Sequence, residues 1–129
     1  MHINDIMYLW LDDVRPLGGE GTSYIGLIQE YECVVAHSVN QAKMLIEIAE
    51  HNGYEKFILD LDHDLGDYAG DGGDGYELVK WLVETGRNTD NYRVYCHSMN
   101  PVGATNILKM RDRYWPEQDD DRFYGEDED

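Results

Sequence analysis

Acidic side chains follow two of the four short apolar runs in this sequence, at the point where each run ends. Asp12 and Asp13 come directly after the first run, and Asp62 and Asp64 follow the third. Carboxylates a few ångströms apart raise each other's pKa, and a hard divalent cation relieves this by taking their oxygens as ligands. We therefore expect these four aspartates to bind Mg²⁺ or Mn²⁺, with helix capping or solvent exposure as the alternative. For Asp60, one pleat before Asp62, a buried hydrogen-bonded role and a place in the site are equally open.

Two histidines, His63 after the third apolar run and His97 after the fourth, add the chemistry of proton transfer. A neutral imidazole, with a reference pKa of about 6.5, can act as a base or, once protonated, as an acid. We expect Asp62, His63 and His97 to be catalytic, with the two histidines as general base and leaving-group acid in an order that the sequence leaves open. His37 precedes a helix cap, and for it a structural role is the stronger interpretation.

A phosphate site is expected at the start of the last helix. Ser98 and Asn100 precede Pro101, and the first N–H groups of a helix attract anions. We count Ser98 among both the catalytic and the phosphate-binding residues, together with Asn100 and Arg15. Arg15 can hold a phosphate through two N–H groups or can pair with Asp13, and both interpretations stay open.

Strands that alternate with helices must position these side chains. Continuous apolar runs at residues 7–11, 33–36, 57–61 and 92–96 predict short strands that are buried on both faces. Helices are predicted after the capping-box residue Ser38, from Tyr76 to Thr85, and from Pro101 to about Arg113. Residues 16–31 contain four glycines, so a full helix there is doubtful. The pattern predicts an α/β domain with a parallel sheet, whose ligands bind where the strands end.

Composition limits the classes of function. The 129 residues contain 27 acids and 10 Lys plus Arg, which gives a net charge of −17 and makes duplex DNA an improbable partner. We expect one domain at residues 1–116, and an acidic, disordered tail at 117–129. No signal peptide and no apolar run of about 18 residues are found, so a cytoplasmic protein without a membrane segment is expected. Cys33 and Cys96 are expected to be reduced thiols. The oligomeric state is not indicated.

Four motifs together resemble the family of cyclic-phosphate processing receiver domains, over about residues 7 to 110. They are Leu11-Asp12-Asp13-x-Arg15-Pro16, Leu61-Asp62-His63-Asp64-Leu65-Gly66, Asp74-Gly75 and His97-Ser98-x-Asn100-Pro101-x-Gly103. The resemblance implies a three-layer, receiver-like (flavodoxin-like) α/β fold with a truncated parallel sheet of about four strands in the order 2-1-3-4. It also implies Mg²⁺ at Asp12, Asp13 and Asp62, and it aligns Ser98 with the hydroxyl residue that follows the fourth strand of receivers.

Two departures from ordinary receivers bear on the expected function. No lysine follows Lys109, where a receiver has one after its fifth strand, and His63 and His97 are additions. The resemblance therefore implies metal-dependent hydrolysis of a cyclic phosphate on a nucleotide, an RNA end or an ADP-ribose-like product. The alternatives are a receiver-like module that binds phosphate or accepts a phosphoryl group without turnover, and an acidic interaction protein that mimics nucleic acid.

Overall fold

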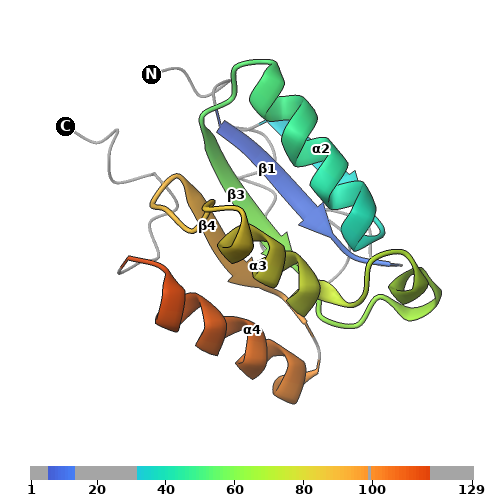
Figure 1. Ribbon diagram of the computed structural model, residues 1–129. Helices are drawn as coiled ribbons and strands as arrows, with labels where there is room; N and C mark the ends of the chain where they lie inside the picture. Colours follow the sequence, from blue (N-terminus) through green and yellow to red (C-terminus); the bar gives the residue numbers. More distant parts are fainter. Residues whose placement is uncertain (1–5, 14–31, 99, 117–129) are drawn as a thin grey trace.

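Four parallel strands form one sheet in the order β2-β1-β3-β4 (Figure 1). The computed structural model describes residues 6–13, 32–98 and 100–116. Its strands are β1 (Ile6–Leu11), β2 (Glu32–Ala36), β3 (Lys56–Leu61) and β4 (Tyr92–Cys96), and its helices are α2 (Val39–His51), α3 (Gly75–Glu84), α4 (Pro101–Tyr114) and the 3₁₀ helix η2 (Gly66–Gly70). The predicted parallel α/β fold and strand order are confirmed. The doubtful helix at 16–31 and the expected tail lie outside the described residues.

The register of the sheet brings all four strand ends to one edge. Leu11 of β1 pairs with Ala36 and Leu61, and Leu61 pairs with Cys96. Backbone hydrogen bonds continue one residue beyond the strands, because the N–H of the next residue after β1, β3 and β4 donates to a neighbouring strand's carbonyl. The side chains that follow the strands are therefore held in a row by the sheet itself.

Alternate residues of β1 face two different hydrophobic clusters. Leu9 and Leu11 pack with buried residues of α2, α3 and α4, so the three α-helices of the described residues share one face of the sheet. Tyr8 and Trp10 belong to the other cluster, which lies on the opposite face and is equally buried. The central strands β1 and β3 are therefore buried on both faces, as their continuous apolar pattern predicts, whereas Val35 of the edge strand β2 is 37 % exposed.

Both predicted helix caps, at Ser38 and at Asn100, are present in the structure, and at the first of them the Gln41 side chain has a different partner from the one expected. The Ser38 hydroxyl accepts from the Gln41 N–H at 3.1 Å. The Gln41 side chain, however, accepts from the N–H of His37 at 2.8 Å and not from that of Ser38, so the box closes one residue earlier than expected. At the start of α4, the Asn100 side chain accepts from the second and third N–H groups, and Pro101 stands at the first position.

The two cysteines are separated by the sheet. Cys33 lies in β2 and Cys96 in β4, the two outer strands, and both are free thiols. Burial raises the pKa of Cys96, which keeps this thiol protonated and unreactive. In the described part of the chain, the helices are all too short or too polar to cross a membrane.

Candidate functional site

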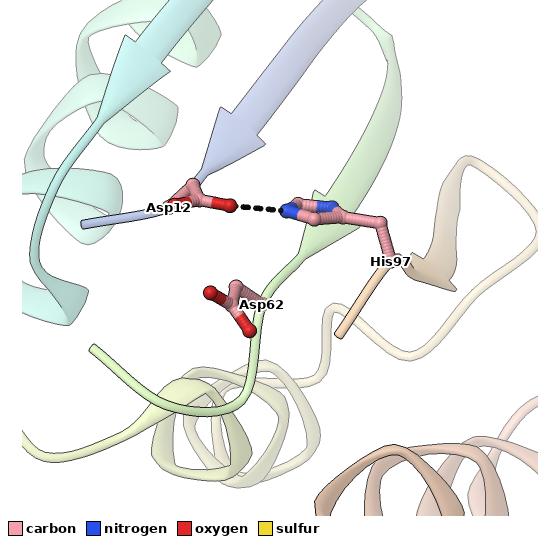
Figure 2. A group of neighbouring side chains, drawn as sticks. All are labelled: Asp12, Asp62 and His97. Atoms are coloured by element: carbon pink, nitrogen blue, oxygen red, sulfur yellow. Dashed lines mark hydrogen bonds and ion pairs between the residues drawn. The ribbon is translucent and has the colours of Figure 1, made fainter. Parts of the chain in front are cut away.

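Three of the predicted site residues converge at the carboxyl edge of the sheet. Asp12, Asp62 and His97, which we call the inner group, follow β1, β3 and β4 and have potential ligand atoms within 4.8 Å of one another (Figure 2). Asp12 is 2 % exposed, and its Oδ2 accepts from Nε2 of His97 at 2.9 Å. The sheet register therefore produces the predicted clustering of acids and histidine.

His97 is held between two carboxylates. Its Nδ1 donates to Asp60 at 2.8 Å, and Asp60, which is fully buried, also accepts from the Tyr8 hydroxyl. Trp10 stacks on the His97 ring with a centroid separation of 3.8 Å and an interplanar angle of 4°. Burial alone would lower the pKa of His97, but the hydrogen bonds and charges of Asp60 and Asp12 outweigh it, and the pKa is raised. Both ring nitrogens face carboxylate oxygens, so both take part in hydrogen bonds and the surroundings favour the doubly protonated imidazolium.

The buried hydrogen-bonded role is therefore the one that the structure gives Asp60. It lies behind the inner group and orients His97 from the side of the sheet. Sequence reasoning did not find Tyr8, which donates to Asp60, or Trp10, which stacks on His97. The signal was present, because residues 8, 10 and 60 occupy alternating strand positions that face the same side. We did not assign these aromatic residues to the site, because aromatic side chains at buried strand positions usually only pack in the hydrophobic core.

Asp62 is the member of the inner group whose carboxyl pKa is raised. Burial raises its pKa most, and the charge of Asp12 raises it further, whereas His97 and a hydrogen bond from the Ser98 side chain act in the opposite direction. Two close carboxylates, one of them with a raised pKa, are a donor set suited to a hard divalent cation. Asp12 and Asp62 therefore fit Mg²⁺ or Mn²⁺, whereas His97 does not, since both its nitrogens are already bonded.

The other expected metal ligands lie beside this group. His63, Asp64 and Asp74, which we call the outer group, have potential ligand atoms within 4.8 Å of one another. The Nδ1 of His63 lies 2.8 Å from Asp64, whose other oxygen accepts from Asn100 at 3.0 Å, and these two hydrogen bonds lower the pKa of Asp64. Asp74, which sequence reasoning did not assign to the site, also accepts from the N–H of Leu65. The four expected ligands are thus not gathered at one point.

Three glycines allow the helices and loops to approach the site. A Cβ at Gly75 would lie 2.1 Å from the carbonyl oxygen of Asp62, and one at Gly103 would lie 2.4 Å from Cγ of His63. Gly66, with a φ of +56°, is similarly close to the carboxylate of Asp13, whose Oδ2 would be 2.6 Å from the added Cβ. Asp13 therefore packs against the loop after β3, and it is not in the inner group.

His37 and Ser38 have structural partners. The Nδ1 of His37 donates to the backbone carbonyl of Asp12 at 3.0 Å. The Ser38 hydroxyl donates to Asp71 at 2.7 Å, and Asn40 donates to the same carboxylate at 3.0 Å. Asp71, which sequence reasoning did not single out, thus ties the loop before α3 to the start of α2. The structural interpretation of His37 fits this arrangement.

The phosphate site expected at the start of α4 stays a prediction, and the N–H groups of this helix start already have partners. The N–H groups of Val102 and Gly103 both donate to the Asn100 side chain, at 3.0 and 3.1 Å, and Pro101 has no N–H. The first turn therefore has no free donor for an anion, because its own cap occupies them. Ser98 keeps a hydroxyl close to Asp62. Arg15 lies outside the described residues.

A parallel sheet with acids after β1 and β3 and a hydroxyl residue after β4 defines a receiver-like α/β domain. The model of the cyclic-phosphate processing receiver domain matches residues 7–113, and the chain belongs to this family. The family connects the chain with cyclic-phosphate processing through a receiver domain. Neither the curated proteins nor the solved structures that were compared with the chain gave a match.

Proposed function

We propose that this protein hydrolyses a cyclic phosphate on a nucleotide, an RNA end or an ADP-ribose-like product, at the carboxyl edge of its sheet. The observation that carries the proposal is the inner group, in which Asp12 and Asp62 meet beside an imidazolium. Such a site combines a cation-binding pair with a fixed positive charge, and both attract a phosphodiester anion. Membership of a family connected with cyclic phosphates supports the choice of substrate class.

Asp12 and Asp62 are the proposed ligands of Mg²⁺ or Mn²⁺. The ion would polarise a phosphoryl oxygen and make a bound water more acidic. His97 holds Asp12 in place through its 2.9 Å hydrogen bond, so the position of one ligand is fixed before the metal arrives. Asp13 and Asp64 are proposed to lie near the metal without binding it directly. The Asp13 carboxylate lies against Gly66, and the Asp64 carboxylate belongs to the outer group.

Of the two histidines, His63 is the one that we assign to proton transfer. Its side chain is 19 % exposed, compared with 5 % for His97. A hydrogen bond from Nδ1 to Asp64 leaves Nε2 as the proton acceptor of the neutral ring, as a general base requires. His97 then acts through its charge, and the Ser98 hydroxyl, which hydrogen-bonds to Asp62 in the structure, turns to donate to a non-bridging oxygen of the substrate. This divides the acid and base roles differently from the expectation based on sequence alone.

Phosphorus NMR tests the proposal. The purified protein is incubated with 2′,3′-cyclic nucleotides, 3′,5′-cyclic nucleotides and ADP-ribose 1″,2″-cyclic phosphate, with Mg²⁺ or Mn²⁺ and then with EDTA. We expect ring opening of one substrate that stops with the chelator. Asp62→Asn should abolish turnover, whereas Asp90→Asn, the same change in the exposed loop before β4, should not. A chain that turns over no member of the panel, or an active Asp62→Asn variant, would contradict this mechanism.

Metal binding can be measured separately from turnover. Asp12→Asn and Asp62→Asn should each weaken Mn²⁺ binding by at least about tenfold, because each removes one of two proposed ligands. Asp13→Asn should weaken it by less than about threefold, since the Asp13 carboxylate packs against Gly66. Water-proton relaxation with Mn²⁺ gives all three values. If Asp13→Asn weakens Mn²⁺ binding as much as Asp12→Asn does, both Asp12 and Asp13 bind the metal and the assignment of ligands is wrong.

A phosphoacceptor without turnover is the second candidate, because the Ser98 side chain hydrogen-bonds to Asp62 in a receiver-like site. Incubation with a small phosphodonor would then give a protein heavier by one phosphoryl group, and hydroxylamine would remove the added mass. The same Asp62→Asn variant would not gain it. Absence of the adduct together with ring opening in the NMR experiment would decide for the hydrolase.

A further inference from the structure

A groove between α3 and α4 lies outside the proposed site. The two helices pack side by side (Figure 1), and the groove has a volume of about 510 Å³. It is lined by Tyr76, Asn106, Lys109, Met110, Arg113 and Tyr114. Its volume falls within the range of small-molecule sites, and its lining combines cations with aromatic rings.

The cations of this groove are unusual for so acidic a chain. Four cations elsewhere in the described residues pair with carboxylates: Lys80 with Glu77, Arg87 with Glu50, Arg93 with Asp90, and Arg111 with Asp112. Lys43 on α2 does not, and it lies over the Trp81 ring instead. Lys109 and Arg113 have no carboxylate partner in the described part of the chain, although the full sequence holds 27 acids. Two unpaired cations one helical turn apart are a natural site for a doubly charged anion.

The aromatic side chains of the groove indicate that the anionic ligand also carries a planar ring. The Arg113 guanidinium lies over the Tyr114 ring, 5.4 Å from its centroid, and Tyr114 is 40 % exposed. Tyr76 adds a second ring from the first turn of α3. An exposed ring beside a guanidinium offers a stacking surface to a planar base, while Asn106 can accept and donate hydrogen bonds.

We propose that this groove binds a nucleotide, with its phosphate between Lys109 and Arg113 and its base against Tyr114. An acidic peptide is the less favoured occupant, since its charges would spread over a surface that is acidic overall, whereas a nucleotide concentrates its charge at one point. None of the lining residues belongs to the inner or the outer group, and Lys109 lies about 13.5 Å along the α4 axis from the cap residue Asn100, at 1.5 Å per residue. Binding there does not depend on a metal or on turnover.

The test is an amide-resolved NMR titration of the full chain in EDTA, with the Asp62→Asn substitution so that the proposed active site is disabled. Adenosine 5′-monophosphate, inorganic phosphate, a single-stranded oligoadenylate and a polyglutamate peptide are the four probes. We expect adenosine 5′-monophosphate to shift the amides of Asn106, Lys109 and Arg113, and to bind at least about fivefold more tightly than inorganic phosphate. The oligoadenylate probe tests whether the groove prefers a free nucleotide or a single-stranded nucleic acid.

Matched charge reversals complete the design. Lys109→Glu should weaken nucleotide binding by about tenfold, and Tyr114→Ala by about fivefold, whereas Lys43→Glu on α2 makes the same charge change without effect. Shifts confined to the carboxyl edge of the sheet, equal binding of phosphate and nucleotide, or a response to polyglutamate alone would each overturn the proposal. None of these outcomes depends on whether the protein hydrolyses cyclic phosphates.

Discussion

His97 joins two buried carboxylates, so its replacement by a neutral residue is the sharpest test of the site's electrostatics. In His97→Gln, the amide can donate to Asp12 or to Asp60 but supplies no charge to either. Removing one partner of a buried ion pair costs about 3–5 kcal/mol, because the remaining charge is left uncompensated. With a urea dependence near 2 kcal/mol per molar, the unfolding midpoint should fall by roughly 2 M.

The direction in which the pKa of His97 is shifted determines how the cost of His97→Gln varies with pH. The pKa of His97 is raised in the folded protein, so the folded state binds a proton more tightly than the unfolded chain. The stabilisation is therefore fully present below the unfolded pKa of about 6.5, and it is lost as pH rises through the folded value. Within that window the difference in unfolding free energy between wild type and His97→Gln should shrink by up to about 1.4 kcal/mol per pH unit.

Urea unfolding followed by circular dichroism, in EDTA and at intervals from pH 5.5 to 9, measures both quantities. Tyr8→Phe is the graded control, because it removes the hydrogen bond that the Tyr8 hydroxyl donates to Asp60 and should cost roughly 1.5–3 kcal/mol. A cost below about 1 kcal/mol for His97→Gln, or a difference that does not vary with pH, would refute the buried imidazolium and with it the role given to His97.

Other predictions concern the loops and the far end of the sheet. Gly103→Ala should displace the His63 ring, which its Cβ would approach to 2.4 Å, and should lower the rate of cyclic-phosphate hydrolysis at a stability cost of about 1–3 kcal/mol, measured by NMR assay and urea unfolding. Arg87→Lys should cost about 1 kcal/mol in thermal or urea unfolding, because lysine cannot form the two hydrogen bonds of 2.7 and 2.8 Å to Glu50. Burial, together with the hydrogen bond to Glu50, raises the pKa of Tyr92 to about 12, so Glu50→Gln should lower it toward 10 in an ultraviolet titration at 295 nm; an unchanged value would exclude this contact.

The sequence by itself determined the elements and the edge at which the chemistry gathers. Continuous apolar runs identify the buried strands, and the caps at Ser38 and Asn100 identify where two helices begin. These signals are local, since they depend on a strand's burial and on N–H groups within one helical turn. Because parallel strands end at a common edge, the meeting of Asp12, Asp62 and His97 also follows from the pattern.

Only the tertiary structure decided which neighbour each side chain took. Asp12 and Asp13 are adjacent in sequence, but successive side chains point in different directions, so one joins His97 and the other packs against Gly66. Whether His97 exchanges protons or holds a fixed charge depends on Asp60, which lies 37 positions away in sequence and 2.8 Å away in space. Such contacts are set by the strand register and the packing of two sheet faces, which no local pattern in the sequence records.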